Sequence, residues 1–399
     1  MNQKSSSARV GGLDTLRAVA ICLVLMTHYN GFVSHQQTFG WIGNVGWAGV
    51  DLFFVLSGYL IGNQITSSVS GGQSWSLRTF FSRRLLRTLP NYYAVLLLYL
   101  VFPGVLTGTS TAPAWQFLTF TQNFGLKYGE TFTHSWSLCI EEQFYLVLPF
   151  AAIAVSKYTR SVRAAWWVLG AAIAGGIVLR GVAARVYGYD SFSAELYYST
   201  FARFDELLCG VAVALLKNFH PAVYASLIRR GNALLIAGLL GAVGVLVALA
   251  AEFPSPHIAT ALGFSLLATS FALLTLAALS PVSLLHRIRI PGAASLALWS
   301  YAIYLVHKPI FMLINPQLTR RHIDAASALV VVPVLALAVA GGWLLFRLVE
   351  TPFMRLRDRW FPPPRGQHDR HSSGVDDRSA QGRRMGPMPR GGPGRLGPS

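Results

Sequence analysis

Apolar stretches long enough to cross a lipid bilayer recur along nearly the whole chain. A transmembrane helix needs about 20 mostly apolar residues. Hydrophobic residues make up 53% of the sequence and charged residues only 12%, which agrees with this reading. We therefore predict an all-α, polytopic integral membrane protein with about ten transmembrane helices. The candidate segments lie near 13–32, 46–66, 91–106, 142–156, 164–186, 204–217, 232–250, 258–279, 293–314 and 326–348.

The distribution of lysine and arginine predicts the orientation of these helices. Positive residues are enriched in cytoplasmic loops of membrane proteins. With the N-terminus placed inside, every second connection is basic, and both termini are expected in the cytoplasm. The segment between Ala251 and His257, expected outside, has no lysine or arginine. The net charge of +17 thus follows from loops and the tail, and we expect contact with membrane lipids and no nucleic-acid partner.

Three regions follow from composition. Residues 1–10 are expected to form a short cytoplasmic segment, and residues 11–358 the transmembrane domain. Residues 359–399 are rich in proline, glycine and arginine with few large apolar side chains. Such a segment cannot bury a core, so we predict a disordered, basic cytoplasmic tail.

The first apolar segment carries two ionisable residues, Arg17 and His28. Their separation of eleven positions returns to nearly the same helical direction, so both point from one face, roughly 16 Å apart along the axis. Ionisable residues inside a membrane usually have a function. The alternative is that His28 merely packs between helices. The predicted orientation puts Arg17 near the cytoplasmic side and His28 near the outer side.

Other polar residues gather at these two depths. Asp51 is expected close to His28, where a carboxylate would fix the tautomer of the imidazole, and Ser57 is expected near mid-membrane. Arg84 and Arg87 are three positions apart on a helical turn and share a face. Paired guanidinium groups suit phosphates, although a simple positive-inside anchor is the alternative.

Four further residues are expected near the outer side with His28, namely His134, Glu141, Arg203 and His307. The alternative for Glu141 is a structural role, because an acidic residue near a helix N-terminus complements the helix dipole. The spacing of the three cysteines, Cys22, Cys139 and Cys209, predicts neither a metal site nor disulfides, and we expect no metal. Ionisable groups near one leaflet, with a phosphate-type site near the other, are typical of a functional rather than a purely structural membrane protein.

Six sequence elements, in order, carry a family resemblance. They are Leu13-Asp14 with Arg17 and His28, Gly49–Ile61, Phe81 with Arg83, Arg84, Arg87 and Pro90, Trp136-Ser-Leu with Glu141 and Phe144-Tyr145, Tyr304–His307, and Glu350–Phe353. Together they resemble the membrane acyltransferase 3 family, which includes O-antigen and Nod-factor acetylases. The resemblance covers about residues 11–358.

This resemblance implies a ten-helix O-acyltransferase of the bacterial inner membrane that moves an acyl group, usually acetyl from acetyl-CoA, to a hydroxyl of a sugar. It implies that His28 is catalytic, and we add Asp51 and Glu141 as residues that orient it. The acyl-CoA is expected to bind near Arg17, Ser57, Arg84 and Arg87. The glycan or glycolipid acceptor is expected near His134, Trp136, Arg203 and His307.

Some relatives in this family carry an extra periplasmic hydrolase-like domain, for which 399 residues leave no room. We therefore expect the membrane domain to act alone or with a partner. The sequence leaves open the acceptor, the acyl chain length, the oligomeric state and the choice between direct transfer and an acyl-histidine intermediate. A proton-coupled transporter of a glycan or lipid precursor is the alternative function, since buried His, Asp and Glu also suit proton relays.

Overall fold

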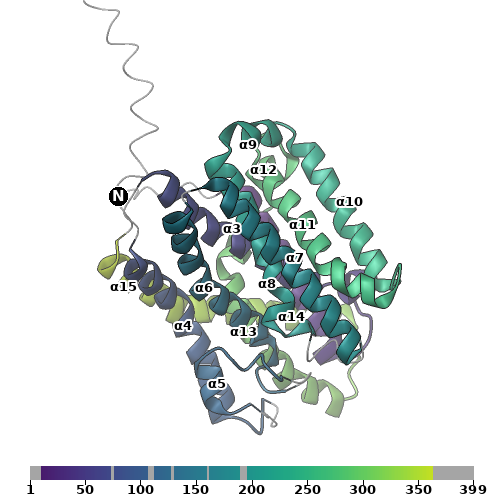
Figure 1. The fold of residues 1–399 in the computed structure, drawn as a ribbon. Helices are drawn as coiled ribbons and strands as arrows, with labels where there is room; N and C mark the ends of the chain where they lie inside the picture. Colours follow the sequence, from purple (N-terminus) through teal and green to yellow (C-terminus); the bar gives the residue numbers. More distant parts are fainter. Residues whose placement is uncertain are drawn as a thin grey trace, which may run out of the picture.

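The computed structural model describes residues 10–72, 76–106, 112–126, 130–159, 161–188 and 196–362. Within these ranges the chain is helical and contains no strand (Figure 1). The predicted all-α class is therefore confirmed. The predicted N-terminal segment and most of the predicted tail lie outside the described residues.

Each of the ten predicted segments falls on a long helix. The long helices are α1 Gly11–Tyr29, α3 Ala48–Ser70, α4 Leu77–Val101, α6 Trp136–Tyr158, α7 Val162–Tyr187, α8 Thr200–Phe219, α10 Gly231–Ala250, α11 Pro256–Leu279, α13 Ala293–Arg320 and α14 Ala328–Leu345. The shorter helices are α2 Gly40–Asn44, α5 Ala114–Leu118, α9 Pro221–Ile228, α12 Leu284–Arg287 and α15 Thr351–Trp360. The turns η1 Asn30–Ser34 and η4 Phe346–Glu350 extend α1 and α14, and η2 Thr133–Ser135 precedes α6.

The number of helices fit to span a membrane is lower than ten. Among the described residues, eight are long and apolar enough, or nine if α8 and α9, which meet at a bend of 111°, form one span. The remaining long helix, α4, has arginines throughout its first half. These arginines lower the mean hydropathy of α4. Its second half, which the sequence predicted as a span, is largely apolar.

Helix α4 also begins earlier than expected. The sequence predicted a span from residue 91, with the preceding arginine-rich stretch as a loop containing a helical turn. In the structure α4 begins at Leu77, where the Ser76 hydroxyl oxygen accepts a hydrogen bond of 3.3 Å from the Thr79 backbone N–H. Such capping satisfies a backbone donor that the first helical turn leaves free. The arginines are thus held on a regular helix rather than on a loop.

The most extensive helix–helix contact joins α3 and α8. Two glycines allow it, because a Cβ atom at Gly58 would overlap the backbone of Leu207, and one at Gly210 would overlap that of Val55. Small residues let helices in membranes approach closely. This contact fixes the rotation of α3, which carries residues of both cavities described below.

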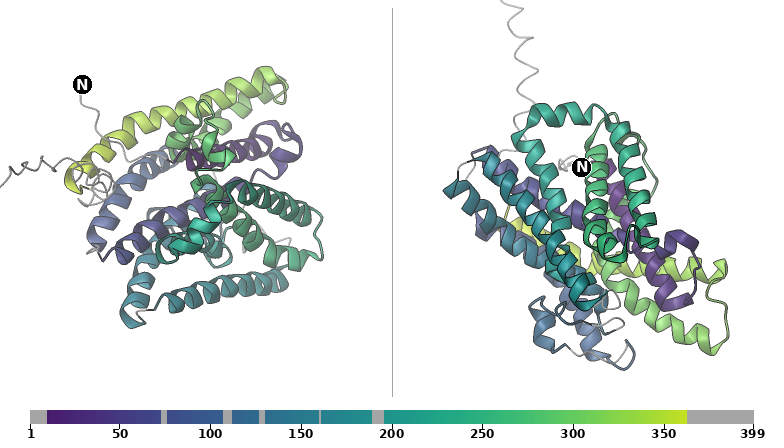
Figure 2. Two further views of the ribbon diagram at one scale, coloured as in Figure 1. Left: turned by 90° about the horizontal axis from the view of Figure 1, so that it is seen from above. Right: turned by 45° about the vertical axis from the view of Figure 1, so that its right-hand side comes forward.

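The helices at the two edges of the bundle come from the end and from the middle of the chain. Helices α14 and α15 form one edge, and α7 lies at the opposite edge (Figure 2). Helix α15 packs against α4. As a result, the C-terminal helix stands next to the arginines of α4.

Candidate functional site

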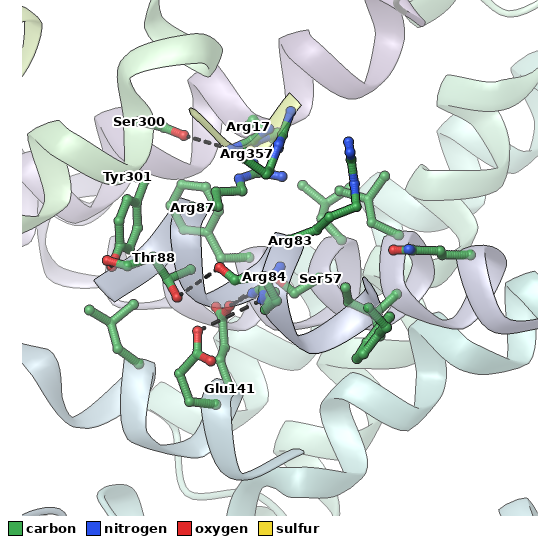
Figure 3. Close-up of a pocket in the computed structure, with 18 of the residues that line it drawn as sticks. Arg17, Ser57, Arg83, Arg84, Arg87, Thr88, Glu141, Ser300, Tyr301 and Arg357 are labelled. Atoms are coloured by element: carbon green, nitrogen blue, oxygen red, sulfur yellow. Dashed lines mark hydrogen bonds and ion pairs between the residues drawn. The ribbon is translucent and has the colours of Figure 1, made fainter. Parts of the chain in front are cut away.

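A cavity of about 660 Å³ lies between α1, α3, α4, α6 and α13, with α15 at its margin. We call it the arginine cavity, because five arginines line it: Arg17 of α1, Arg83, Arg84 and Arg87 of α4, and Arg357 of α15 (Figure 3). Three of the predicted donor-binding residues, Arg17, Arg84 and Arg87, are therefore brought together. Arg17 comes from α1, and Arg84 and Arg87 come from α4, which is distant from α1 in the sequence.

One wall of the arginine cavity is a stripe on α3. The stripe consists of Val50, Phe53, Ser57, Leu60 and Gln64, which recur every three or four positions. This spacing keeps them on one helical face. Ser57, the fourth predicted donor-binding residue, thus lies in the same cavity as the arginines.

Two glutamates compensate one of these arginines. The Arg84 guanidinium lies 3.7 Å from the Glu141 carboxylate and 3.8 Å from that of Glu142. It also stands over the Tyr145 ring, 3.5 Å from the ring centroid. Figure 3 shows Arg84 turned toward Glu141. Arg84 is therefore part of a local ion-pair network that joins α4 to α6 at the wall of the cavity.

Two other arginines form no direct ion pair within the described residues, although the Glu350 carboxylate acts on both electrostatically. Arg17 donates a hydrogen bond of 3.1 Å to the Ser300 hydroxyl, and the Arg87 guanidinium has no hydrogen-bond or ion-pair partner in the described part of the chain. Both line the arginine cavity. Unpaired guanidinium groups in a partly enclosed space present both positive charge and directed N–H donors, which favours an anionic ligand.

Glu141 does not lie where the sequence placed it. We expected it near His28, but it lines the arginine cavity, where it accepts hydrogen bonds from the Ser57 hydroxyl at 3.1 Å and from the Tyr145 hydroxyl. The prediction of a contact with His28 is wrong. The physical reason is that Glu141 follows Trp136 by more than one helical turn, which carries it deeper along α6 and around to the face that meets α4.

A second cavity, of about 640 Å³, is lined by His28, His134 and Trp136, and we call it the histidine cavity. The structure thus brings these three predicted residues together. Its other walls are rich in aromatic rings: Phe32, Trp41, Trp47, Tyr197, Tyr198 and Phe264. Aromatic rings beside a few polar groups are typical of a site for an organic ligand.

The partner of His28 is His307 and not Asp51. The His28 Nδ1 atom lies 2.6 Å from Nε2 of His307, and the two rings are nearly parallel, at 6°. His307 is fully buried and lines neither cavity. His307 therefore contacts His28 from the protein interior, outside both cavities. The predicted contact of His307 with the acceptor is not supported by this position.

Asp51 is fully buried and pairs with Arg203 at 2.9 Å. The expected Asp51–His28 contact is therefore wrong. Asp51 and Val50 are adjacent on α3, so their side chains point about 100° apart. Val50 faces the cavities, and Asp51 consequently faces α8.

Arg203 is likewise enclosed rather than available to a ligand. It also pairs with Glu206, and its guanidinium lies 4.1 Å from the centroid of the Phe264 ring. It lines neither cavity. The predicted role of Arg203 in binding the acceptor is not supported by its position, because its charge is already satisfied by two carboxylates.

Val50 is the residue that sequence reasoning missed. It is 5% exposed and, among the described residues, is the one that lines both cavities. Its spacing of seven positions from Ser57 could have indicated a shared face. A lone valine in an apolar helix nevertheless gives no signal of its own. The two cavities therefore meet at this side chain.

The chain matches the acyltransferase domain of the acyltransferase 3 family over residues 10–347. It belongs to this family of membrane acyltransferases, and the resemblance found in the sequence is confirmed. No solved structure is significantly similar to it.

Similar proteins include the peptidoglycan O-acetyltransferase OatA of Listeria monocytogenes. The identity is 30% over 378 residues, covering 87% of this chain and 56% of that protein. A protein of Bacillus subtilis, named as putative peptidoglycan O-acetyltransferase YrhL, is 34% identical over 222 residues, or 52% of this chain and 33% of its own length. The chain thus spans between a third and somewhat over half of these relatives.

Proposed function

We propose that this protein is a multi-pass O-acyltransferase of the bacterial cytoplasmic membrane, which transfers an acetyl group from acetyl-CoA to a hydroxyl of a cell-surface carbohydrate. The names of the similar proteins make peptidoglycan the first acceptor to test. The arginine cavity is assigned to the cytoplasmic side, in keeping with the lysine and arginine distribution. We assign both chain ends to the same side on the same distribution.

The observation that supports this proposal best is the pair Arg17 and Arg87. Neither guanidinium forms a direct ion pair in the described residues, and both line a cavity of about 660 Å³. The phosphates of a CoA thioester are the anions that this charge would accommodate. The cavity then extends along α3 past Ser57 to Val50, a route that suits a long, thin donor.

The chemistry assigned to the histidine cavity is proton transfer at His28. The acceptor oxygen bonds to the acyl carbon as its proton moves to His28, and the carbon–sulfur bond breaks. The proton then passes from His28 to the departing thiolate, so that the free thiol of CoA and the ester are the products. A positioned base of this kind contributes roughly 10²- to 10⁴-fold to a rate.

Replacing His28 with asparagine tests this function. Asparagine can still donate a hydrogen bond to His307, but it has no ring nitrogen that can take up a proton. We expect acetyl transfer to fall by roughly 10²-fold or more. The measurement is base-labile label on soluble peptidoglycan fragments, after incubation of the purified protein in lipid vesicles with radiolabelled acetyl-CoA.

His322→Asn is the matched control, because His322 is exposed and lines neither cavity. It should leave the rate unchanged. Transfer by the His28→Asn variant at the rate of the parent protein would contradict the proposal. Proton-driven uptake of a carbohydrate by the vesicles, without release of CoA, would instead favour a transporter.

Arg87→Ala tests the assignment of the donor. If Arg87 binds a phosphate, the variant loses a charge-assisted hydrogen bond of about 1.5–3 kcal/mol. The KM for acetyl-CoA should then rise roughly ten- to hundredfold, with a much smaller change in kcat. Steady-state release of the CoA thiol measures both constants.

Arg78→Ala is the control for this experiment, because Arg78 lies on the same helix but is exposed and outside the cavity. The KM of this variant should match that of the parent protein. A KM that is equally unchanged in Arg87→Ala would remove Arg87 from the donor site.

A further inference from the structure

The contacts of His307 determine which of its nitrogens carries a proton. Its Nδ1 atom lies 3.1 Å from the backbone oxygen of Ile303, one helical turn earlier on α13. A carbonyl oxygen can only accept a hydrogen bond, so Nδ1 is the protonated nitrogen. His307 is fully buried, and burial without a carboxylate partner favours the neutral ring. Its Nε2 atom is therefore a lone-pair acceptor.

The same reasoning then fixes His28. Because Nε2 of His307 accepts, the His28 Nδ1 atom at 2.6 Å must be the donor. A neutral imidazole has one N–H, so Nε2 of His28 carries the lone pair. This atom makes no hydrogen bond within the described residues. It is also not one of the buried polar atoms that lack a partner, so it is not sealed inside the protein. His28 lines the histidine cavity, and its basic nitrogen is thus accessible from there.

The ring of His307 is held in place by its neighbours. Phe311 meets it edge-on at a centroid distance of 5.6 Å, and His134 does so at 5.2 Å. His134 is itself anchored, since its Nε2 atom lies 3.1 Å from the Leu305 backbone oxygen. Lys308, the nearest cation on the same helix, donates to the Glu130 backbone oxygen and the Thr133 hydroxyl. The acceptor atom of His307 cannot easily turn away from His28.

We propose that His307 is the positioning residue of the reaction: it holds His28 with its proton on Nδ1 and its lone pair on Nε2, facing the histidine cavity. The inference rests on the proposed function. When His28 takes the proton of the acceptor hydroxyl, its Nδ1–H bond to His307 becomes a charge-assisted bond and strengthens. A neutral imidazole and a backbone carbonyl thereby do the work that a carboxylate does in other histidine-based sites.

Two variants of nearly equal length separate this role from a packing role. In His307→Gln the side-chain oxygen can accept from His28, whereas in His307→Met no comparable acceptor remains. We expect kcat to fall roughly ten- to hundredfold more in the methionine variant than in the glutamine variant. The KM for acetyl-CoA should be the same in both, because His307 does not line the arginine cavity.

Nitrogen-15 NMR of histidine-labelled protein provides a readout that does not depend on activity. We expect the His28 signals, assigned by their loss in His28→Asn, to show a protonated Nδ1 in the parent protein and in His307→Gln. In His307→Met they should shift toward a mixture of tautomers. A His28 ring protonated at Nε2 in the parent protein would overturn the inference.

Equal kcat values for the glutamine and methionine variants would also overturn it. This outcome is distinct from failure of the proposed function. If His28→Asn is inactive but His307→Met is unaffected, only the role of His307 is contradicted. If His28→Asn remains active, the proposed function itself is contradicted.

Discussion

Replacing Val50 with tryptophan is expected to abolish acyl transfer and to leave acetyl-CoA binding intact. Val50 lines both cavities and is 5% exposed. The indole ring of tryptophan at this position should therefore fill the junction, the space where the two cavities meet. In the proposed function the donor phosphates bind among the arginines, and no arginine of the described residues lines the histidine cavity. Because a displacement of about 1 Å can cost roughly 10²-fold in rate, a blocked junction should reduce turnover by at least that factor.

The measurement compares turnover with binding, the latter by calorimetric titration of a non-hydrolysable acetyl-CoA analogue. Binding also reports whether the variant is folded, since overpacking a core can cost about 1–3 kcal/mol. Val69→Trp is the matched control, because Val69 is exposed near the end of the same helix. Val50→Ala widens the junction and should retain transfer. Normal turnover in Val50→Trp would mean that the acyl group takes another route.

Replacing Arg180 with methionine is expected to destabilise the bundle by about 3–5 kcal/mol, because it leaves a buried carboxylate without its partner. Arg180 of α7 and Asp205 of α8 are both fully buried and form two hydrogen bonds of 3.0 Å. Arg180 also donates to the Ser265 hydroxyl at 2.6 Å. This cluster joins α7, α8 and α11 and lies outside both cavities.

Unfolding of the purified protein in detergent, followed against denaturant or temperature, measures this loss. The double variant Arg180→Met with Asp205→Leu should recover much of the stability, because apolar residues often replace a buried ion pair without net loss. Arg163→Met, at an exposed position of α7, should change stability by less than about 0.5 kcal/mol. An Arg180→Met variant with the unfolding midpoint of the parent protein would show that Asp205 is satisfied by other groups.

Most helix positions were predictable from the sequence because long apolar stretches in a membrane protein must form helices. The prediction was weakest for α4, where arginines interrupt the apolar pattern while the backbone remains helical. Local capping at Ser76 determines where this helix begins. The distribution of lysine and arginine gave an orientation that stays a prediction.

The site was predictable where residues on one helix determine it. The spacing of Arg84 and Arg87, and of Arg17 and His28, depends only on helical geometry. The neighbours of these residues depend instead on how each helix is rotated against the next. Asp51 was therefore assigned to His28 on depth alone, although the contact between α3 and α8 turns it toward Arg203.

The arrangement around Val50 bears on how the membrane stays sealed. Two cavities that contain ionisable side chains within one bundle thin the apolar layer that separates the aqueous compartments. In this chain the residue shared by the two cavities is Val50, which is 5% exposed. Narrow apolar constrictions stop water and ions by remaining dry. If the acyl group passes here, as the proposed function requires, the permeability barrier and the acyl passage depend on the same side chain.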